Sequence, residues 1–162
     1  MGVAVFAGTF DPFTKGHLDI VERASRMFVA VYILIGNNPS KTPTFTRNIR
    51  AELIKKSVSH LPRVNVAISS ERLLVEDIKL LRATINIRGF RNAEDMGYES
   101  KMEDINRILA PDIETIYMKS LPEVAHISSS AYTEIMKLSE KGSWMVDEHT
   151  HKFYNDYFHG EV

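Results

Sequence analysis

The segment AGTFDPFTKGH, residues 7–17, decides how the rest of this sequence is interpreted. It follows a short apolar run, residues 3–7, and leads into a segment in which apolar residues recur every three to four positions. Gly8 allows a sharp turn and a close approach of the backbone to a ligand. Gly16 and His17 open the following helix, whose free N–H groups and dipole favour an anion. The segment therefore predicts a strand-to-helix loop that carries chemistry.

Apolar, β-branched runs recur along the chain and alternate with stretches of helical spacing. The runs expected to be strands are residues 3–7, 29–35, 64–68, 84–87 and 115–118. The stretches expected to be helices are residues 18–28, 49–58 (behind Thr46 as N-cap), 73–81, 99–109, 130–139 and one from about residue 147. This alternation predicts an α/β fold with a single doubly wound parallel five-stranded sheet and helices on both faces. We expect one domain, residues 1–162, because no linker or internal repeat interrupts the pattern.

The position of the first loop makes it a candidate binding site. In an open α/β sheet, ligands bind outside the carboxyl ends of the strands, and residues 7–17 are expected at that edge. The sequence contains neither G-x-x-x-x-G-K-[ST] nor G-x-G-x-x-G, so the two familiar phosphate-binding loops are excluded. A nucleotide site would depend on Gly8-Thr9 together with Gly16-His17. His17 taken alone would be interpreted as a surface histidine in a capping loop.

The composition excludes several classes of function. The formal net charge is −1, which does not suggest the broad basic face of a nucleic-acid binder. The lack of cysteine excludes a disulfide framework, a thiolate nucleophile and a thiolate metal site. No apolar run approaches the ~20 residues that a membrane helix needs, and the start of the chain does not resemble a signal peptide. We therefore expect a cytoplasmic protein that binds neither nucleic acid nor membranes.

Four segments together resemble one known family. TKGH, residues 14–17, resembles the signature of the nucleotidyltransferase superfamily, in which His or Thr is followed by any residue, Gly and His. NPSKTPTFT (38–46), IRGFR (87–91) followed by YE (98–99), and HISSS (126–130) resemble segments of the phosphopantetheine adenylyltransferase family. The order and spacing of these segments agree with that family from residue 3 to about residue 140.

The resemblance implies a Rossmann-like nucleotidyltransferase fold and a reaction. ATP and 4′-phosphopantetheine would give dephospho-coenzyme A and pyrophosphate, with Mg²⁺ as cofactor. The nucleophile would be the phosphate monoester of phosphopantetheine, whose second pKa is ~6, so that it is an anion at neutral pH and needs no general base. The resemblance also implies a homohexamer and coenzyme A as a feedback ligand of the same pocket.

The resemblance assigns roles to particular residues. The residues expected to act in catalysis are Thr9, His17, Lys41 and Arg91. The residues expected to bind the phosphopantetheine substrate are Thr9, Lys41, Leu74 and Arg88. The residues expected to bind ATP are Thr9, Phe10, His17, Gly89, Phe90, Arg91, Glu99, Val124, Ala125, His126, Ile127, Ser128, Ser129 and Ser130. Among them, His17 would stabilise charge near the α-phosphate, and Lys41 would hold the phosphate of phosphopantetheine.

Several of these residues also have a purely structural interpretation. Leu74 could be a core leucine, and Glu99 could be a solvated helix residue. Residues 128–130 could cap the following helix, which is compatible with phosphate binding because both use a helix N-terminus. Ala7 stands where the family usually has proline. Residues 119–126 also depart from the family pattern, and in the family this stretch contacts adenine.

The last segment, residues 147–162, contains three histidines and an aromatic stripe. His149 and His151 do not share a face of a helix, and no cysteine or set of carboxylates completes a metal shell, so we expect no metal ligands in the protein. The stripe is expected to pack on the domain or on a neighbouring subunit. Its members are Phe153, Tyr154, Tyr157 and Phe158.

Two alternatives to the leading function remain open at this point. One is a sibling nucleotidyltransferase that uses another phosphate acceptor, such as nicotinate mononucleotide or glycerol phosphate. The other is a non-catalytic module that binds a nucleotide as a sensor. The lysine, arginine and serine segments argue against the sibling. The full set of Thr9, His17, Lys41, Arg88 and Arg91 argues against a sensor that has lost turnover.

Overall fold

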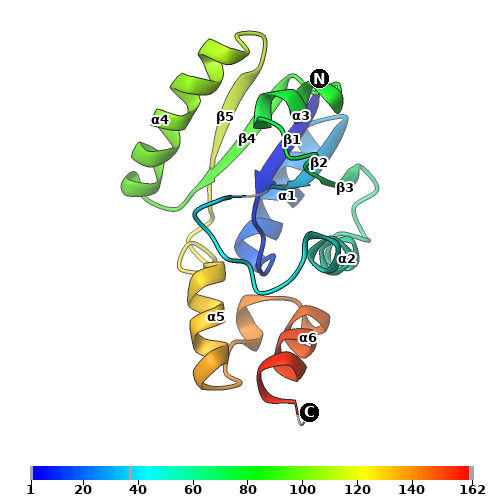
Figure 1. Ribbon diagram of the computed structural model, residues 1–162, viewed down its shortest axis with the longest axis vertical. Helices are drawn as coiled ribbons and strands as arrows, with labels where there is room; N and C mark the ends of the chain where they lie inside the picture. The colour runs from blue at the N-terminus through cyan, green and yellow to red at the C-terminus, as the bar shows by residue number, and fades with distance from the viewer. Residues whose placement is uncertain (1, 37, 161–162) are drawn as a thin grey trace.

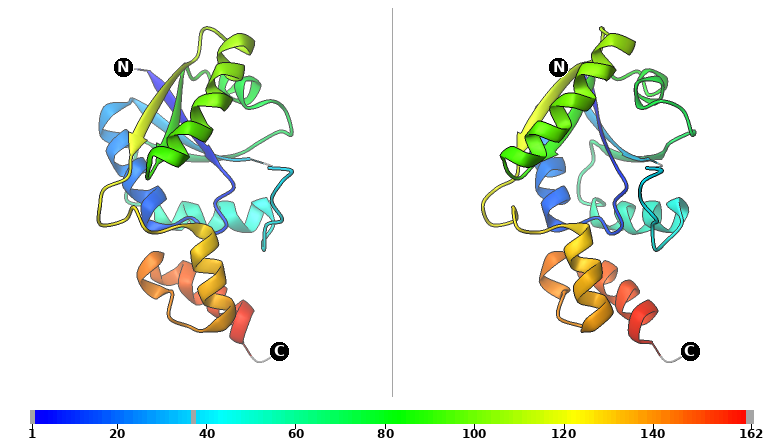
Figure 2. Two further views of the ribbon diagram at one scale, coloured as in Figure 1. Left: turned by 90° about the vertical axis from the view of Figure 1, so that its left-hand side faces the viewer. Right: turned by 60° about the vertical axis from the view of Figure 1, so that its left-hand side comes forward.

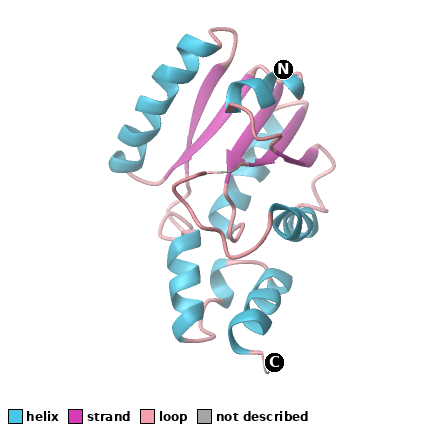
Figure 3. Ribbon diagram, in the orientation of Figure 1, coloured by secondary structure: helices cyan, strands magenta, loops and turns pink. Residues whose placement is uncertain are grey.

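The computed structural model describes residues 2–36 and 38–160, apart from the side chain of Tyr98. Residues 1, 37 and 161–162 of the expected domain, and the tyrosine side chain of the YE pair, lie outside the described residues. Five parallel strands form one sheet in the order β3-β2-β1-β4-β5 (Figures 1 and 3). The strands are β1 (Val3–Gly8), β2 (Ala30–Ile35), β3 (Val64–Ile68), β4 (Ile85–Phe90) and β5 (Glu114–Lys119).

Helices connect the strands and cover both faces of the sheet. They are α1 (Lys15–Met27), α2 (Arg47–Ser57), α3 (Leu74–Leu80), α4 (Ala93–Leu109), α5 (Ser129–Leu138), the 3₁₀ helix η1 (Ser143–Met145) and α6 (Glu148–His159). Successive side chains of β1 point to opposite faces, as strand geometry requires. Ala4 and Phe6 join the apolar cluster of α1 and α2, whereas Val5 joins the cluster that contains α3. The expected doubly wound α/β fold is therefore confirmed.

Most helix starts follow from local capping. The side chain of Thr46 accepts a hydrogen bond from the Ile49 N–H (3.4 Å), which confirms it as the N-cap of α2. Helix α4 begins at Ala93 rather than at the expected residue 99. The reason is a second cap, because the Asn92 side chain accepts from the Asp95 N–H (2.9 Å) and starts the helix earlier. Within the part of the chain that is described, none of the helices is both long and apolar enough to cross a bilayer.

The architecture places the first loop at a switch in strand order. Strand β1 pairs with β2 on one side and with β4 on the other. The connection after β1 leads to β2, whereas the connection after β4 leads to β5, so the two crossovers run in opposite directions. At such a point the loops beyond the carboxyl ends diverge and leave a crevice. Helices α5 and α6 lie beyond the same edge of the sheet, below the strand tips in Figures 1 and 2. Residues of α5 line the cavity at this edge, whereas α6 packs behind α5.

A separate apolar cluster joins the C-terminal helices to the rest of the fold. It contains Leu53 from α2, Tyr132 and Met136 from α5, and Tyr154 from α6, with Phe45 from the preceding loop. Through this cluster α2 and α6 support α5, which lines the cavity at the edge of the sheet.

Replacement of Leu53 by alanine should lower the free energy of unfolding by about 3 kcal/mol, because the side chain is 8% exposed and its loss leaves a cavity. Urea denaturation at neutral pH measures this change. Leu138→Ala is the matched control, since the same atoms are removed from a helical leucine that is 82% exposed, and it should change the value by less than about 0.5 kcal/mol. Equal losses for the two variants would contradict the assignment of this cluster to the core.

Candidate active site

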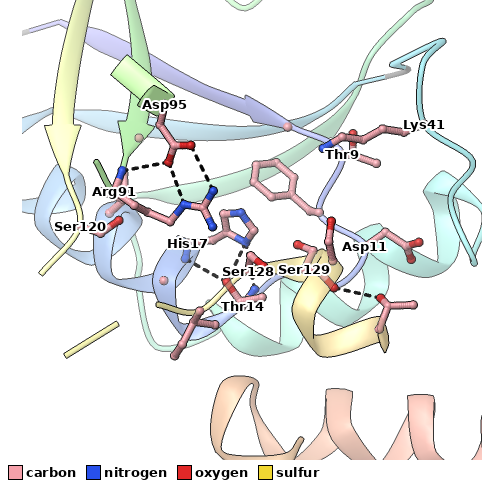
Figure 4. A pocket seen from close by; sticks show the side chains of 18 of the residues that line it. Thr9, Asp11, Thr14, His17, Lys41, Arg91, Asp95, Ser120, Ser128 and Ser129 are labelled. Atoms are coloured by element: carbon pink, nitrogen blue, oxygen red, sulfur yellow. Dashed lines mark hydrogen bonds and ion pairs between the residues drawn. The ribbon is translucent and has the colours of Figure 1, made fainter. Parts of the chain in front are cut away.

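A cavity of about 860 Å³ opens at the carboxyl edge of the sheet, where the first loop leaves β1. Its walls come from that loop, the start of α1, residues 41–44, the end of β4, the start of α4 and the start of α5. His17, Lys41 and Arg91 all line it, although the sequence separates them widely. Figure 4 shows the Arg91 guanidinium beside the His17 ring, with Lys41 across the cavity next to Thr9. The scattered cationic segments therefore meet in one place.

The first turn of α1 fixes the chemical form of His17. The backbone N–H of Thr14 donates to Nδ1 of His17 (3.0 Å), while the Thr14 hydroxyl accepts from the His17 backbone N–H (3.4 Å). This reciprocal arrangement is a capping box, and it satisfies two backbone donors at the helix start. Because Nδ1 accepts a hydrogen bond, the ring proton must reside on Nε2. His17 therefore presents an N–H donor on the side of its ring away from Thr14.

His17 is also held in its neutral state. Burial, followed by the positive charges of Lys41 and Arg91, lowers its pKa from the ordinary 6.5 to about 4. Three aromatic rings surround the imidazole, with centroid distances of 6.2 Å for Phe6, 5.0 Å for Phe10 and 5.5 Å for Phe13. These apolar neighbours remove the water that would otherwise stabilise a charged ring.

Phe10 reaches its place against His17 through an unusual backbone conformation. Its φ angle is +51°, in the left-handed region that bulky residues rarely adopt. A Cβ atom on Gly8 would lie 2.8 Å from the Phe10 ring, so glycine at this position makes room for the turn. Backbone strain of this kind persists only where surrounding contacts hold it, and it is common at functional sites.

Arg91 is oriented by an acidic partner that the sequence analysis missed. Its Nε and Nη2 donate to the two carboxylate oxygens of Asp95 at 2.8 and 3.2 Å, one turn later in the chain. This bonding raises the pKa of Arg91 and lowers that of Asp95. The available signal was the i, i+4 spacing of an arginine and an aspartate at the start of a helix. Both side chains line the cavity.

A second cavity of about 700 Å³ adjoins the first. Thr9, Lys41, Arg88 and Glu99 line both cavities, so they stand at the junction. Arg88 is paired with Glu99 through its Nε. Beyond the junction, the lining includes the apolar side chains Leu34, Leu73, Leu74, Met102, Ile105 and Leu109. The pair of cavities thus joins a polar chamber to a chamber with a large apolar share.

Leu74 is a core leucine, as one of its two interpretations expected, and its contact with the pantetheine arm stays a prediction. It packs against the apolar cluster around Val75 and Ile78, and it also lines the second cavity. Ser128 likewise caps a helix, since its hydroxyl accepts from the Ala131 N–H (3.1 Å) while the residue lines the first cavity. The adjacent Ser129 hydroxyl donates to the Pro12 carbonyl (2.8 Å), which ties the start of α5 to the first loop.

The residues expected to bind ATP divide into two groups. Those that line the first cavity are Thr9, Phe10, His17, Gly89, Arg91, Glu99, Ile127, Ser128, Ser129 and Ser130. Those that do not line it are Phe90, Val124, Ala125 and His126. His126 instead stacks on Trp144, with ring centroids 5.4 Å apart. Binding of ATP stays a prediction for both groups, as does the contact of residues 119–126 with adenine.

Two further charged residues, Arg50 and Asp11, fix the first loop through hydrogen bonds. The buried Arg50, which is 3% exposed, donates through Nε to the Phe45 carbonyl (3.0 Å) and through Nη1 to the Thr9 carbonyl. Asp11 accepts hydrogen bonds from the Tyr154 hydroxyl and from the Thr44 backbone. Asp11 belongs to residues 7–17, but the sequence pattern did not predict its role. Nothing in the local sequence distinguishes Arg50 from a solvated helix arginine.

In the free protein, His17 should remain neutral, with its proton on Nε2, from pH 8 down to about pH 5. The ¹⁵N chemical shifts of the imidazole measure both properties. The free energy of unfolding should fall as the pH drops from 6.5 towards 4, because over that interval the unfolded chain takes up a proton that the folded chain refuses. A titration midpoint near 6.5, or a proton on Nδ1, would contradict this description of the site.

Comparison with known proteins identifies the group to which this arrangement belongs. Residues 5–135 match the sequence model of the cytidylyltransferase-like family. Two curated proteins named phosphopantetheine adenylyltransferase, from Streptococcus pneumoniae strains CGSP14 and 70585, are 44% and 43% identical to this chain over 146 residues, which is 90% of each chain.

Solved structures agree on the fold. A putative nicotinate-nucleotide adenylyltransferase from Vibrio parahaemolyticus superposes with a TM-score of 0.71 over 99% of this chain and 96% of that chain, at 13% identity. The lipopolysaccharide core biosynthesis protein from Thermoplasma volcanium GSS1 has a TM-score of 0.56 at 20% identity, over 75% of this chain and 99% of that chain. The family assignment comes from the sequence, because the curated relatives are 44% and 43% identical over 90% of this chain. The chain therefore belongs to the phosphopantetheine adenylyltransferase family, within the cytidylyltransferase-like nucleotidyltransferases.

Proposed function

We propose that this enzyme transfers AMP from ATP to 4′-phosphopantetheine and forms dephospho-coenzyme A and pyrophosphate. The observation that carries the proposal is the pair of cavities joined at Thr9, Lys41 and Arg88. The polar chamber around His17 suits the triphosphate of ATP. The more apolar chamber suits the pantetheine arm, and the cations at the junction suit the phosphate that must meet the α-phosphate of ATP.

The reaction needs alignment and charge stabilisation rather than a base. An oxygen of the phosphopantetheine phosphate bonds to the α-phosphorus of ATP, and the bond from that phosphorus to the bridging oxygen of pyrophosphate breaks. The attacking phosphate is an anion at neutral pH, so no proton has to be removed from it. The Nε2–H of His17 donates to an oxygen of the α-phosphate as negative charge develops there. A neutral donor remains in place across the whole physiological pH range.

The other cationic side chains and the N-terminus of α5 bind the remaining phosphate groups of the two substrates. Lys41 and Arg88 hold the phosphate of phosphopantetheine at the junction. Arg91 and the N-terminus of α5, with residues 128–130, hold the β- and γ-phosphates. Since Asp95 fixes two of the Arg91 nitrogens in advance, less conformational freedom is lost when the nucleotide binds.

Mg²⁺ enters this scheme as part of the nucleotide substrate. Across residues 2–36 and 38–160, no cluster of three or more His, Cys, Asp or Glu side chains is placed to hold a metal ion. In the cavity, Asp95 and Glu99 are paired with arginines. These donors do not fit a protein-built metal site, and we propose that the ion is carried by the phosphates and water.

Three wider properties are part of the same proposal. A homohexamer is proposed from the family resemblance, and Ile108 of α4, which is 83% exposed and lines neither cavity, is a candidate interface residue. Coenzyme A contains the pantetheine arm and is proposed to compete for the second cavity as a feedback ligand. A cytoplasmic location is proposed because ATP is the nucleotide substrate.

Pyrophosphate release with different acceptors tests the assignment of substrates. The protein is incubated with ATP, Mg²⁺ and, separately, 4′-phosphopantetheine, nicotinate mononucleotide and glycerol phosphate. Release with phosphopantetheine alone is expected. Release with another acceptor would replace the proposed substrate. Tight ATP binding without release for any acceptor would point to a nucleotide sensor instead.

His17→Ala should lower kcat roughly 100- to 1,000-fold and change the KM values much less, because its hydrogen bond strengthens as charge develops in the transition state. Steady-state kinetics with each substrate varied in turn measures the two effects. A rise in KM at unchanged kcat would show that His17 contributes to ground-state binding rather than to the chemical step.

Lys41→Ala should raise the KM for phosphopantetheine roughly 10- to 100-fold, since a charged hydrogen bond to its phosphate is lost. The Kd for ATP, measured by calorimetry without the acceptor, should change far less. Equal weakening of both substrates would contradict the placement of Lys41 on the acceptor phosphate.

A further inference from the structure

The C-terminal helix α6 contacts residues 9–14, here called the catalytic loop, through one buried hydroxyl group. Tyr154 of α6 is 0% exposed, and its hydroxyl donates to Oδ1 of Asp11 at 2.6 Å. Burial and the neighbouring Asp11 carboxylate raise the pKa of Tyr154, so the hydroxyl keeps its proton and remains a donor. The two residues are 143 positions apart, and the contact links the tail to the loop that precedes His17.

The same carboxylate also holds the loop that carries Lys41. Oδ2 of Asp11 accepts from the backbone N–H of Thr44. Residues 41–44 line the first cavity, and Lys41 reaches the junction with the second. One side chain thus ties the catalytic loop, the lysine loop and α6 together. Figure 4 shows Asp11 on the stretch of chain between Thr9 and Thr14.

Anchors stand on both sides of the strained residue Phe10. On one side, Arg50 donates to the carbonyl of Thr9. On the other, Asp11 is held by the two bonds from Tyr154 and Thr44. A bulky residue with φ of +51° keeps that conformation only if its neighbours are fixed. These anchors hold the backbone on both sides of Phe10, while His17 itself is held by its capping box with Thr14.

We propose that Tyr154 is a positioning residue for adenylyl transfer: through Asp11 it sets the Lys41 loop against the catalytic loop. This inference rests on the proposed function and assigns a role in it to the C-terminal helix. The geometry carries it because the hydroxyl of Tyr154 contacts neither cavity, yet the carboxylate that it holds contacts both loops. The acceptor phosphate, which Lys41 binds, is the ligand whose alignment depends most on this link.

Tyr154→Phe removes the link and little else. The ring keeps its packing against Phe45, with centroids 4.8 Å apart, and against Tyr132 at 5.5 Å. The KM for phosphopantetheine should rise by up to about tenfold, because the loop that carries Lys41 is no longer fixed against the catalytic loop and the substrate must order it on binding. The Kd for ATP alone should change less than twofold, because Arg91 and His17 are held by other contacts.

Tyr132→Phe is the matched control. Tyr132 is equally buried and belongs to the same apolar cluster, but its hydroxyl pairs with Nδ1 of His151 (3.2 Å) and touches neither loop. Tyr132→Phe should lower the melting temperature about as much as Tyr154→Phe. It should leave the KM for phosphopantetheine and the Kd for ATP unchanged. An equal effect of the two variants on the KM would overturn the proposal, as would equal weakening of ATP and phosphopantetheine by Tyr154→Phe.

Asp11→Ala provides a second variant, and it lies outside the apolar cluster of α5 and α6. The methyl group offers no acceptor, so the bonds from Tyr154 and from Thr44 are both broken. It should raise the KM for phosphopantetheine, and combining it with Tyr154→Phe should add little, because both changes break the same link. Fully additive effects would overturn the proposal. Inactivity of the unaltered enzyme with phosphopantetheine would instead refute the proposed function, so the two failures are distinguishable.

Discussion

The hydrogen bond from the Thr14 N–H to Nδ1 of His17 underlies both the local structure and the chemistry of the site. It satisfies a backbone donor at the start of α1, and it leaves the ring proton on Nε2. A protonated imidazole could not accept this bond, so charging His17 would break the cap as well as the donor geometry. The helix start and the catalytic state of the histidine are therefore one physical arrangement.

The cavity offsets its positive charges before any substrate arrives. Arg88 is paired with Glu99, and Arg91 is paired with Asp95. Partly buried cations without partners would be costly, whereas paired ones are held in a defined orientation. Helix α4 supplies both acids, since the early start at Ala93 brings Asp95 as well as Glu99 to the edge of the sheet. The anionic substrates therefore meet arginine side chains whose orientation is already fixed.

Helix α6 supports the site through the packing of its aromatic side chains as well as through the hydroxyl of Tyr154. Phe153, Tyr154 and Tyr157 surround the ring of Phe45 at centroid distances of 4.8 to 5.0 Å. Phe45 precedes α2 and lies at the end of the loop that carries Lys41. The aromatic stripe was expected to pack on the domain or on a neighbouring subunit, and in the described residues it packs on the domain, against this loop.

Local patterns in the sequence determined the strand–helix alternation, the Thr46 cap, the place of residues 7–17 at the carboxyl edge, and His17 at a helix start. These features depend on periodicity, capping and turn formation, which act between residues near one another in the chain. Tertiary structure alone decided that Asp11 joins Tyr154 to Thr44, that buried Arg50 holds Thr9, and that His126 stacks on Trp144 instead of lining the cavity. Such contacts join segments that lie far apart in the chain, and they depend on the direction of each side chain once the helices have packed, which spacing along the sequence does not contain.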